Sequence, residues 1–191
     1  PLAQAAERAV KAGIVVVASA GNRGETADGK TVFGSVTSPG NSPFVITVGA
    51  VRANGTADHG DDTLAPWSSR GPTQFDYVVK PDIAAPGSSV WLPSHWGPLA
   101  WLQVTGTSFS SPATAAAAAL IMHAGVTNPR AVKALLINSA DDRGGVGAKN
   151  LSGLGNSGTD DLPGIERLAD LAGEPMDRIE VTQTLVERAV G

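Results

Sequence analysis

The sequence has no cysteine, which excludes disulfide bonds, thiolate zinc sites and a cysteine nucleophile. Charge is also sparse: 17% of the 191 residues are charged and the net charge is −4, so the basic composition typical of nucleic-acid binders is missing. No apolar run approaches the roughly 18 residues that cross a membrane. The chain begins without a charged leader and apolar core, so we find no signal peptide and expect a processed or truncated chain.

Glycine and proline are abundant instead, at 23 and 13 residues, which predicts many loops and tight turns. Apolar residues at helical spacing predict a helix over residues 2–12. The runs IVVVASA (14–20) and FVITVGAV (44–51) lack alternation, which is typical of strands buried on both faces. Helix, strand, long connection and strand in this order predict a layered α/β fold. We expect residues 52–88 to be mostly irregular, short strands at 90–92 and 101–104, and helices at 108–123 and 129–138.

The composition changes after the last of these helices. From Asp141 to Asp161 the chain is rich in Gly, Asn, Ser and Asp, which predicts a linker or long surface loop. The segments LPGIERLADLAG and EPMDRIEVTQTLVERAV then predict two amphipathic helices. We therefore treat residues 141–191 as a region of their own.

The stretch TGTSFSSPATAAAAALIM (105–122) joins small polar residues to a run of alanines. It places Ser108 at or near the start of a helix, where backbone N–H groups are unpaired and the helix dipole is positive. These N–H groups would stabilise an oxyanion formed next to Ser108. The alternative is that Ser108 is only the N-cap of the helix, a position that serine commonly occupies.

A second polar residue follows the first predicted strand. In VVVASAGNRG, Asn22 lies just beyond the carboxyl end of a buried strand, where α/β sheets bind ligands. Its side-chain amide could donate a hydrogen bond to a developing oxyanion. The alternative is an asparagine that serves only a turn.

Four segments together resemble the C-terminal half of the catalytic domain of subtilisin-like serine proteases, in the family's order. The last segment alone also fits the related sedolisins, but these have Asp where this chain has Asn22, which favours the subtilisin type. The resemblance implies a three-layer α/β fold with a mostly parallel sheet between helices, present here only in part and carried by residues 1–140. The segments are ASAGNRG (18–24), SPGNSPFVITVGAV (38–51), WSSRGPTQFDYVVKPDIAAPG (67–87) and TGTSFSSPATAAAAALI (105–121).

The resemblance also assigns roles. It implies that Ser108 is the nucleophile of a serine endopeptidase, with the oxyanion held by Asn22 and the Ser108 N–H. Polypeptides are then the substrates, the protein is secreted, and no cofactor is required. Arg23 lies at the mouth of the pocket for the residue before the cleaved bond, where a cation would favour acidic or polar side chains. The substrate-binding residues implied are Gly21, Arg23, Thr37, Gly106 and Thr107.

The base and its orienting carboxylate are missing from this pattern. In the family, the Asp and His precede the Ser along the chain, and no matching segment occurs here. We interpret His59, His95 and His123 as surface or structural residues. The chain is therefore expected to be inactive alone and to need a partner that carries the N-terminal half of the domain. The alternative is a non-catalytic pseudoprotease or peptide-binding module on the same scaffold.

The segment before the second predicted strand carries two further expectations. Ser38–Pro39–Gly40 resembles the family's turn with a cis peptide bond before the proline. In some relatives, the carbonyl groups around Gly40, Ser42 and Val45 bind a cation. Hard cations prefer such oxygens, so a structural calcium or sodium ion is a candidate here.

Overall fold

The structure is a computed structural model that describes residues 1–55, 61–94 and 100–140. The predicted loop and helices after residue 140 lie outside the described residues, as do His59 and His95. In the described residues, the elements in chain order are α1 (Leu2–Lys11), β1 (Val17–Ser19), β2 (Ile46–Arg52), β3 (Thr63–Leu64), β4 (Ile83–Pro86), β5 (Val90–Pro93), β6 (Trp101–Val104), α2 (Thr107–His123) and α3 (Pro129–Ser139).

The sheet is built around β2. Strands β1 and β4 both pair with β2 in parallel, and β3 pairs with its far end antiparallel. The first five residues of β2, Ile46 to Ala50, are all buried, so this strand is covered on both faces as its unbroken apolar run predicts. The predicted α/β fold with a mostly parallel sheet is confirmed. Strands β5 and β6 form a separate antiparallel hairpin.

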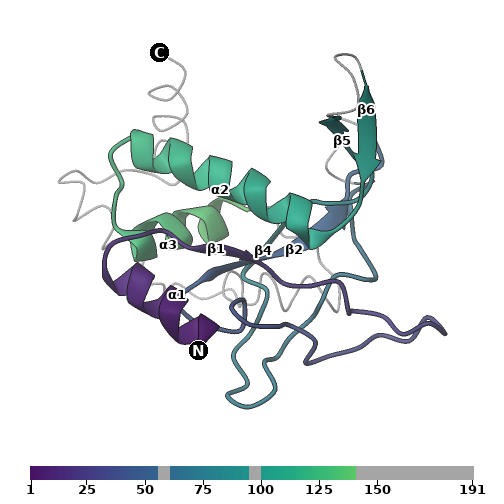
Figure 1. Ribbon diagram of the computed structural model, residues 1–191, viewed down its shortest axis with the longest axis horizontal. Helices are drawn as coiled ribbons and strands as arrows, with labels where there is room; N and C mark the ends of the chain where they lie inside the picture. The colour runs from purple at the N-terminus through teal and green to yellow at the C-terminus, as the bar shows by residue number, and fades with distance from the viewer. Residues whose placement is uncertain (56–60, 95–99, 141–191) are drawn as a thin grey trace.

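Helix α2 covers one face of the sheet and contacts all three parallel strands (Figure 1). Its small residues allow this close approach, and Thr114 and Ala118 are buried in the contact. Helix α3 packs against α2 and is capped by the side chain of Asn128, which accepts the N–H groups of Arg130 and Ala131. The buried core between these layers consists of Ile46, Val48, Ala118, Val132 and Leu136.

The long connections after β1 and β3 run on the side of the sheet away from α2 (Figure 1). Ser68 in the second connection accepts the N–H of Ala50 with its Oγ at 3.0 Å, which ties this layer to β2. Here the sequence expectation for residues 52–88 was incomplete, because β3 and β4 form within it. Strand β4 is only four residues long and ends in Pro86, so its formation depends on parallel pairing with β2 rather than on a local pattern.

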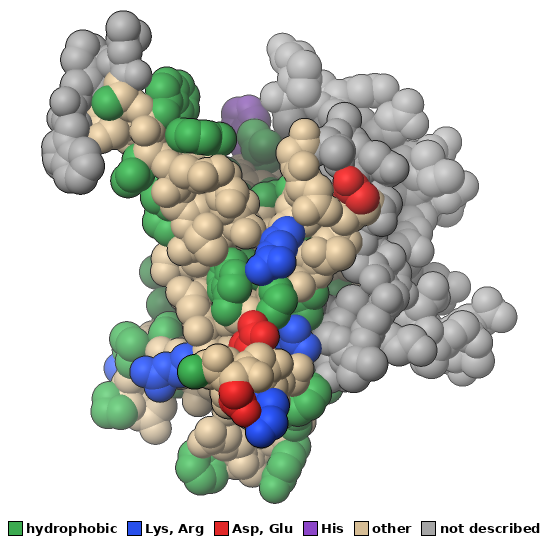
Figure 2. Space-filling model, turned by 90° about the vertical axis from the view of Figure 1, so that its right-hand side faces the viewer, with side chains coloured by type: hydrophobic (Ala, Val, Ile, Leu, Met, Phe, Trp, Pro, Cys, Tyr) green, Lys and Arg blue, Asp and Glu red, His purple; other side chains and the backbone are tan. Residues whose placement is uncertain are grey.

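The peptide bond before Pro39 is cis, as predicted, and the bonds before Pro72 and Pro81 are cis as well. None of the helices in the described part of the chain is both long and apolar enough to cross a membrane. On the face shown in Figure 2, basic and acidic side chains are interspersed rather than gathered by sign. This distribution agrees with the low net charge of the sequence.

Candidate active site

The candidate residues come together at the carboxyl edge of the parallel strands. Strand β1 ends at Ser19, shortly before Asn22, and β4 ends at Pro86. The carbonyl of the next residue, Gly87, accepts the N–H of Gly106 at 2.8 Å, which brings the start of α2 to the same edge. This is the edge at which α/β sheets bind ligands.

Ser108 is the second residue of α2, and its side chain is exposed. The N-cap position belongs to Gly106, so the alternative that Ser108 is merely the N-cap is wrong. Gly106 has a φ of +155°, which side-chain-bearing residues rarely adopt, and a Cβ there would lie 3.3 Å from Asn22 Nδ2. Glycine at this position therefore lets the helix begin directly beside the asparagine.

Asn22 is bonded to the beginning of α2. Its Oδ1 accepts hydrogen bonds from the Thr107 N–H at 3.0 Å and from the Thr107 hydroxyl at 2.9 Å, across 85 residues of sequence. A backbone N–H can only donate, so the oxygen must face Thr107 and the Nδ2 group is left to point elsewhere. The side chain is therefore more than a local turn element: it joins two distant segments, and its amide Nδ2 lies near Gly106, at the start of α2.

Thr107 fixes the position of Asn22 through a buried side chain. Its side chain is 1% exposed, and its hydroxyl also accepts the N–H of Gly21 at 3.2 Å. Both the donor and an acceptor site of the hydroxyl are thus used within the protein. Of the residues that the resemblance assigns to substrate binding, Thr107 contacts Asn22 through its side chain and positions it.

Gly21, Thr37 and Arg23 lie together. The N–H of Thr37 donates to the Ala20 carbonyl at 3.3 Å, and its hydroxyl lies 3.5 Å from the Cβ position of Gly21. Arg23 is exposed. Thr37 and Gly21 are therefore neighbours at the end of β1, and Asn22 and Arg23 follow Gly21 along the chain.

The sequence interpretation did not assign roles to Ser68 and Ser69, which support these residues. Ser69 Oγ accepts the Arg23 N–H at 3.1 Å, and the Ser69 N–H donates to the Gly21 carbonyl at 2.8 Å. A Cβ on Gly24 would lie only 1.9 Å from the Ser68 carbonyl oxygen. Their segment was part of the recognised pattern, but hydroxyl contacts to distant backbone leave no spacing that a sequence could reveal.

The hairpin of β5 and β6 stands beside the start of α2 (Figure 1). The Ser89 N–H donates to Thr105 Oγ1 at 2.9 Å, which joins the base of the hairpin to the residue before Gly106. Trp91 and Trp101 are 60% and 62% exposed, so these two indoles do not cover the core. Their strand register puts them on one face of the hairpin.

His123 does not reach the candidate nucleophile. It is exposed in the last turn of α2. The 15 helical steps between it and Ser108 correspond to roughly 20 Å at 1.5 Å per residue. In the described residues, no histidine is therefore in a position to act as the base for Ser108.

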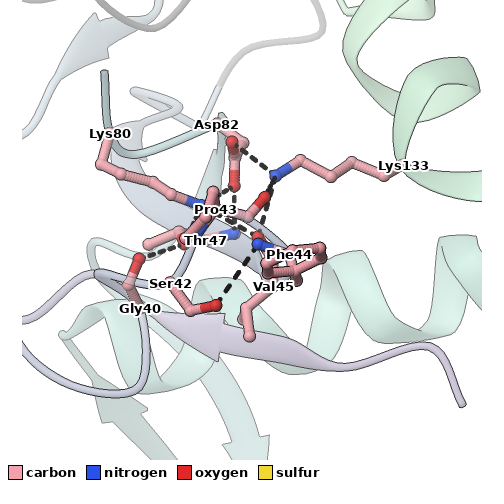
Figure 3. Close-up of polar contacts among 9 residues, drawn as sticks. All are labelled: Gly40, Ser42, Pro43, Phe44, Val45, Thr47, Lys80, Asp82 and Lys133. Atoms are coloured by element: carbon pink, nitrogen blue, oxygen red, sulfur yellow. Dashed lines mark hydrogen bonds and ion pairs between the residues drawn. The ribbon is translucent and has the colours of Figure 1, made fainter. Parts of the chain in front are cut away.

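Two of the three carbonyl groups proposed for a cation, those of Gly40 and Val45, already have other partners (Figure 3). The Val45 carbonyl accepts from Lys80 Nζ at 2.9 Å and from Lys133 Nζ at 3.0 Å. The Gly40 carbonyl accepts the Thr47 hydroxyl at 2.6 Å. A calcium or sodium ion here would have to displace both ammonium groups, so the residues as arranged do not fit the ion that the resemblance offers.

Comparison with known proteins agrees with this geometry. Residues 1–155 match the Subtilase family (Peptidase_S8). The chain belongs to the subtilase family. It is 43% identical to the serine protease AprX of Bacillus subtilis over 156 residues, covering 74% of this chain and 33% of that protein. It is 36% identical to subtilisin-like protease 2 of Trichophyton rubrum, covering 72% of this chain and 28% of that protein.

Two solved structures share the fold. Sphericase superposes with a TM-score of 0.55 at 29% identity, covering 71% of this chain and 43% of that one. The self-cleaved protease domain of PatA gives a TM-score of 0.60 at 23% identity, covering 92% of this chain and 56% of that one. The chain thus spans about a third of the length of the curated relatives it matches, and about half of the length of these structures.

Proposed function

We propose that the intact protein containing this chain is a serine endopeptidase of the subtilase type. Ser108 Oγ attacks the carbonyl carbon of a peptide bond, its proton passes to a base, and an acyl-enzyme forms as the amine leaves with a proton from that base. The oxyanion is held by Asn22 Nδ2 and the Ser108 N–H. Water then hydrolyses the acyl-enzyme and frees Ser108.

The contact between Asn22 and Thr107 is the observation that carries this proposal. It fixes the Asn22 side chain to Thr107, the residue before an exposed serine at a helix start, and this supports a pairing of nucleophile and amide donor such as acyl transfer needs. Family membership adds independent support.

We propose that the base comes from outside this chain, on the N-terminal half of the domain. Helix α2 supports the presence of such a partner. Its residues Ala115–Met122 are apolar on every side, and helices of this kind are normally buried. Here, however, Leu120 is 56% exposed. Exposed small or apolar side chains along the same helix are Ala113, Ala115, Ala116 and Ala119.

Phosphonate labelling tests this proposal. In the intact protein, we expect a serine-reactive fluorophosphonate to modify Ser108, with loss of peptidase activity. The isolated 191-residue chain should react at least about a hundredfold more slowly, because no base removes the serine proton. Rapid labelling of the isolated chain would contradict an external base. An intact protein that binds peptides without labelling or cleavage would be the peptide-binding module instead.

Arg23 is expected to influence which peptides are cleaved. Its position next to Asn22 favours an acidic side chain before the scissile bond. In the intact protein, we expect Arg23→Ala to lower the ratio of kcat/KM for Glu over Lys substrates by about threefold to tenfold, less at high salt. Arg23→Lys, which keeps the charge, is the matched control. An unchanged ratio in the alanine variant would refute this role.

We also propose, on the resemblance alone, that the intact protein is secreted. Detection of the protein in the culture medium of its source, with intracellular markers absent, is the expected result. Retention inside the cell would be inconsistent with this placement.

A further inference from the structure

Lys80 is a buried cation at the amino-terminal end of the parallel strands. Its side chain is fully buried, and its ammonium donates three hydrogen bonds (Figure 3). The acceptors are the Val45 carbonyl at 2.9 Å, Thr47 Oγ1 at 2.9 Å and Asp82 Oδ2 at 2.6 Å. An ammonium has three N–H donors, so all of them are used.

Lys133 of α3 approaches the same Val45 carbonyl and the other oxygen of the Asp82 carboxylate. Its Nζ donates to the Pro43 carbonyl at 2.9 Å and the Val45 carbonyl at 3.0 Å, and it pairs with Asp82 Oδ1 at 2.9 Å. Asp82 Oδ2 also accepts the Thr47 N–H at 2.8 Å. Burial lowers the pKa of Lys80 to about 8 against the attraction of the Asp82 carboxylate, which leaves the side chain protonated at neutral pH.

The oxygens that Lys80 contacts include one that the sequence resemblance assigns to a cation, the Val45 carbonyl. A hard cation would be held here by carbonyl oxygens and a carboxylate. Lys80 brings a positive charge to the Val45 carbonyl directly, and it reaches the Gly40 carbonyl through Thr47, whose hydroxyl donates to it at 2.6 Å. The positive charge is supplied by the chain itself, and a buried charge of this kind must be paired to be tolerated.

We propose that the Lys80 ammonium takes the place of a structural cation in this segment, so that residues 40–47 are ordered without calcium or sodium. Lys133 and Asp82 complete the arrangement. Lys133 pairs with Asp82 Oδ1, the oxygen that Lys80 does not contact, so the carboxylate aligns both ammonium groups. The proposal rests on the contacts of Lys80 and does not depend on the protease proposal.

Residues 40–47 adjoin the candidate active site, so their order affects that site. Residue Thr37, which lies beside Gly21 in the candidate active site, is followed directly by the turn that leads to Gly40. The Asn41 N–H donates to the Thr37 carbonyl at 3.2 Å, so the two parts are bonded to each other. The Lys80 ammonium would keep residues 40–47, and with them the part of the candidate site around Thr37, ordered when calcium and sodium are scarce.

Hydrogen exchange of the peptide covering residues 40–47, in the intact protein, tests the proposal. In the wild type, we expect the same exchange rate in calcium chloride, in sodium chloride and in choline chloride with a chelator. In Lys80→Ala, we expect exchange at least about tenfold faster, because the carboxylate and carbonyl lose their partner. Calcium, sodium or ammonium ions should then slow it again by entering the space that the side chain leaves.

Lys30→Ala is the matched control. Lys30 also pairs with a carboxylate, Asp28, at 2.7 Å, but its side chain is 80% exposed, so its removal should leave exchange in residues 40–47 unchanged. If residues 40–47 of the wild type exchange more slowly in calcium or sodium chloride than in choline chloride, the proposal is overturned. This comparison uses only the wild type, so it tests the proposal even if Lys80→Ala does not fold. Unchanged exchange in a folded Lys80→Ala variant, or no recovery with any of the three ions, would overturn it too.

Discussion

Replacing Ser108 with alanine in the intact protein is expected to lower kcat by at least about a thousandfold, with KM nearly unchanged. The magnitude is one established for this family rather than derived from the structure. The physical reason is that the alanine variant has no oxygen to form the acyl-enzyme, whereas the pocket that binds the peptide is retained. Steady-state hydrolysis of a chromogenic peptide measures both constants.

Ser111→Ala is the control for Ser108→Ala. Ser111 lies one turn further along α2 and is partly buried, so its removal changes the same helix without touching the position at the helix start. We expect it to change kcat by less than about threefold. Equal losses in both variants would mean that damage to α2, rather than loss of a nucleophile, explains the result.

Replacing Asn22 with alanine is expected to lower kcat by about a hundredfold to a thousandfold, again a magnitude known from this family. The side chain donates only once negative charge develops on the substrate oxygen, so kcat and kcat/KM should fall together. Steady-state hydrolysis of the same chromogenic peptide measures both constants. The protein should still fold, because the substitution removes two hydrogen bonds to Thr107, each worth about 1 kcal/mol.

Thr107 provides the control for Asn22. Thr107→Ser keeps the hydroxyl that bonds Asn22 and Gly21, whereas Thr107→Val keeps the shape and loses both bonds. We expect the serine variant to retain most of the activity and the valine variant to lose about tenfold. If Asn22→Ala hydrolyses peptides at the wild-type rate, the Asn22 amide has no part in the mechanism. If the two Thr107 variants have equal rates, the Thr107 hydroxyl does not position Asn22.

Much of the layered fold could be predicted because the decisive patterns are local. The unbroken apolar run of β2, the alanines of α2 and Pro129 at the start of α3 each mark an element by themselves. The boundaries shifted where tertiary contacts decide them: β1 is only Val17–Ser19, within the longer predicted run, because β2 pairs with those three residues alone.

The sequence indicated which residues to consider for the candidate site but not how they are arranged in space. The positions of Asn22 and Ser108 came from strand and helix ends and from resemblance, but the bond from Asn22 to Thr107 depends on two segments meeting in space. Lys80 could not be assigned at all. Two of its three partners, the Val45 carbonyl and the Thr47 hydroxyl, lie 35 and 33 positions away along the chain, so its sequence neighbours do not reveal that it replaces an ion.

The bond between Asn22 and Thr107 also has a consequence for the order of events in folding. The two residues are 85 positions apart, and they meet where α2 packs on the paired strands β1 and β2. Contacts of such long range form slowly and late. The contact between Asn22 and Thr107 is therefore expected only when the surrounding layers are complete, and under the proposed function a nascent chain would lack the arrangement that stabilises an oxyanion.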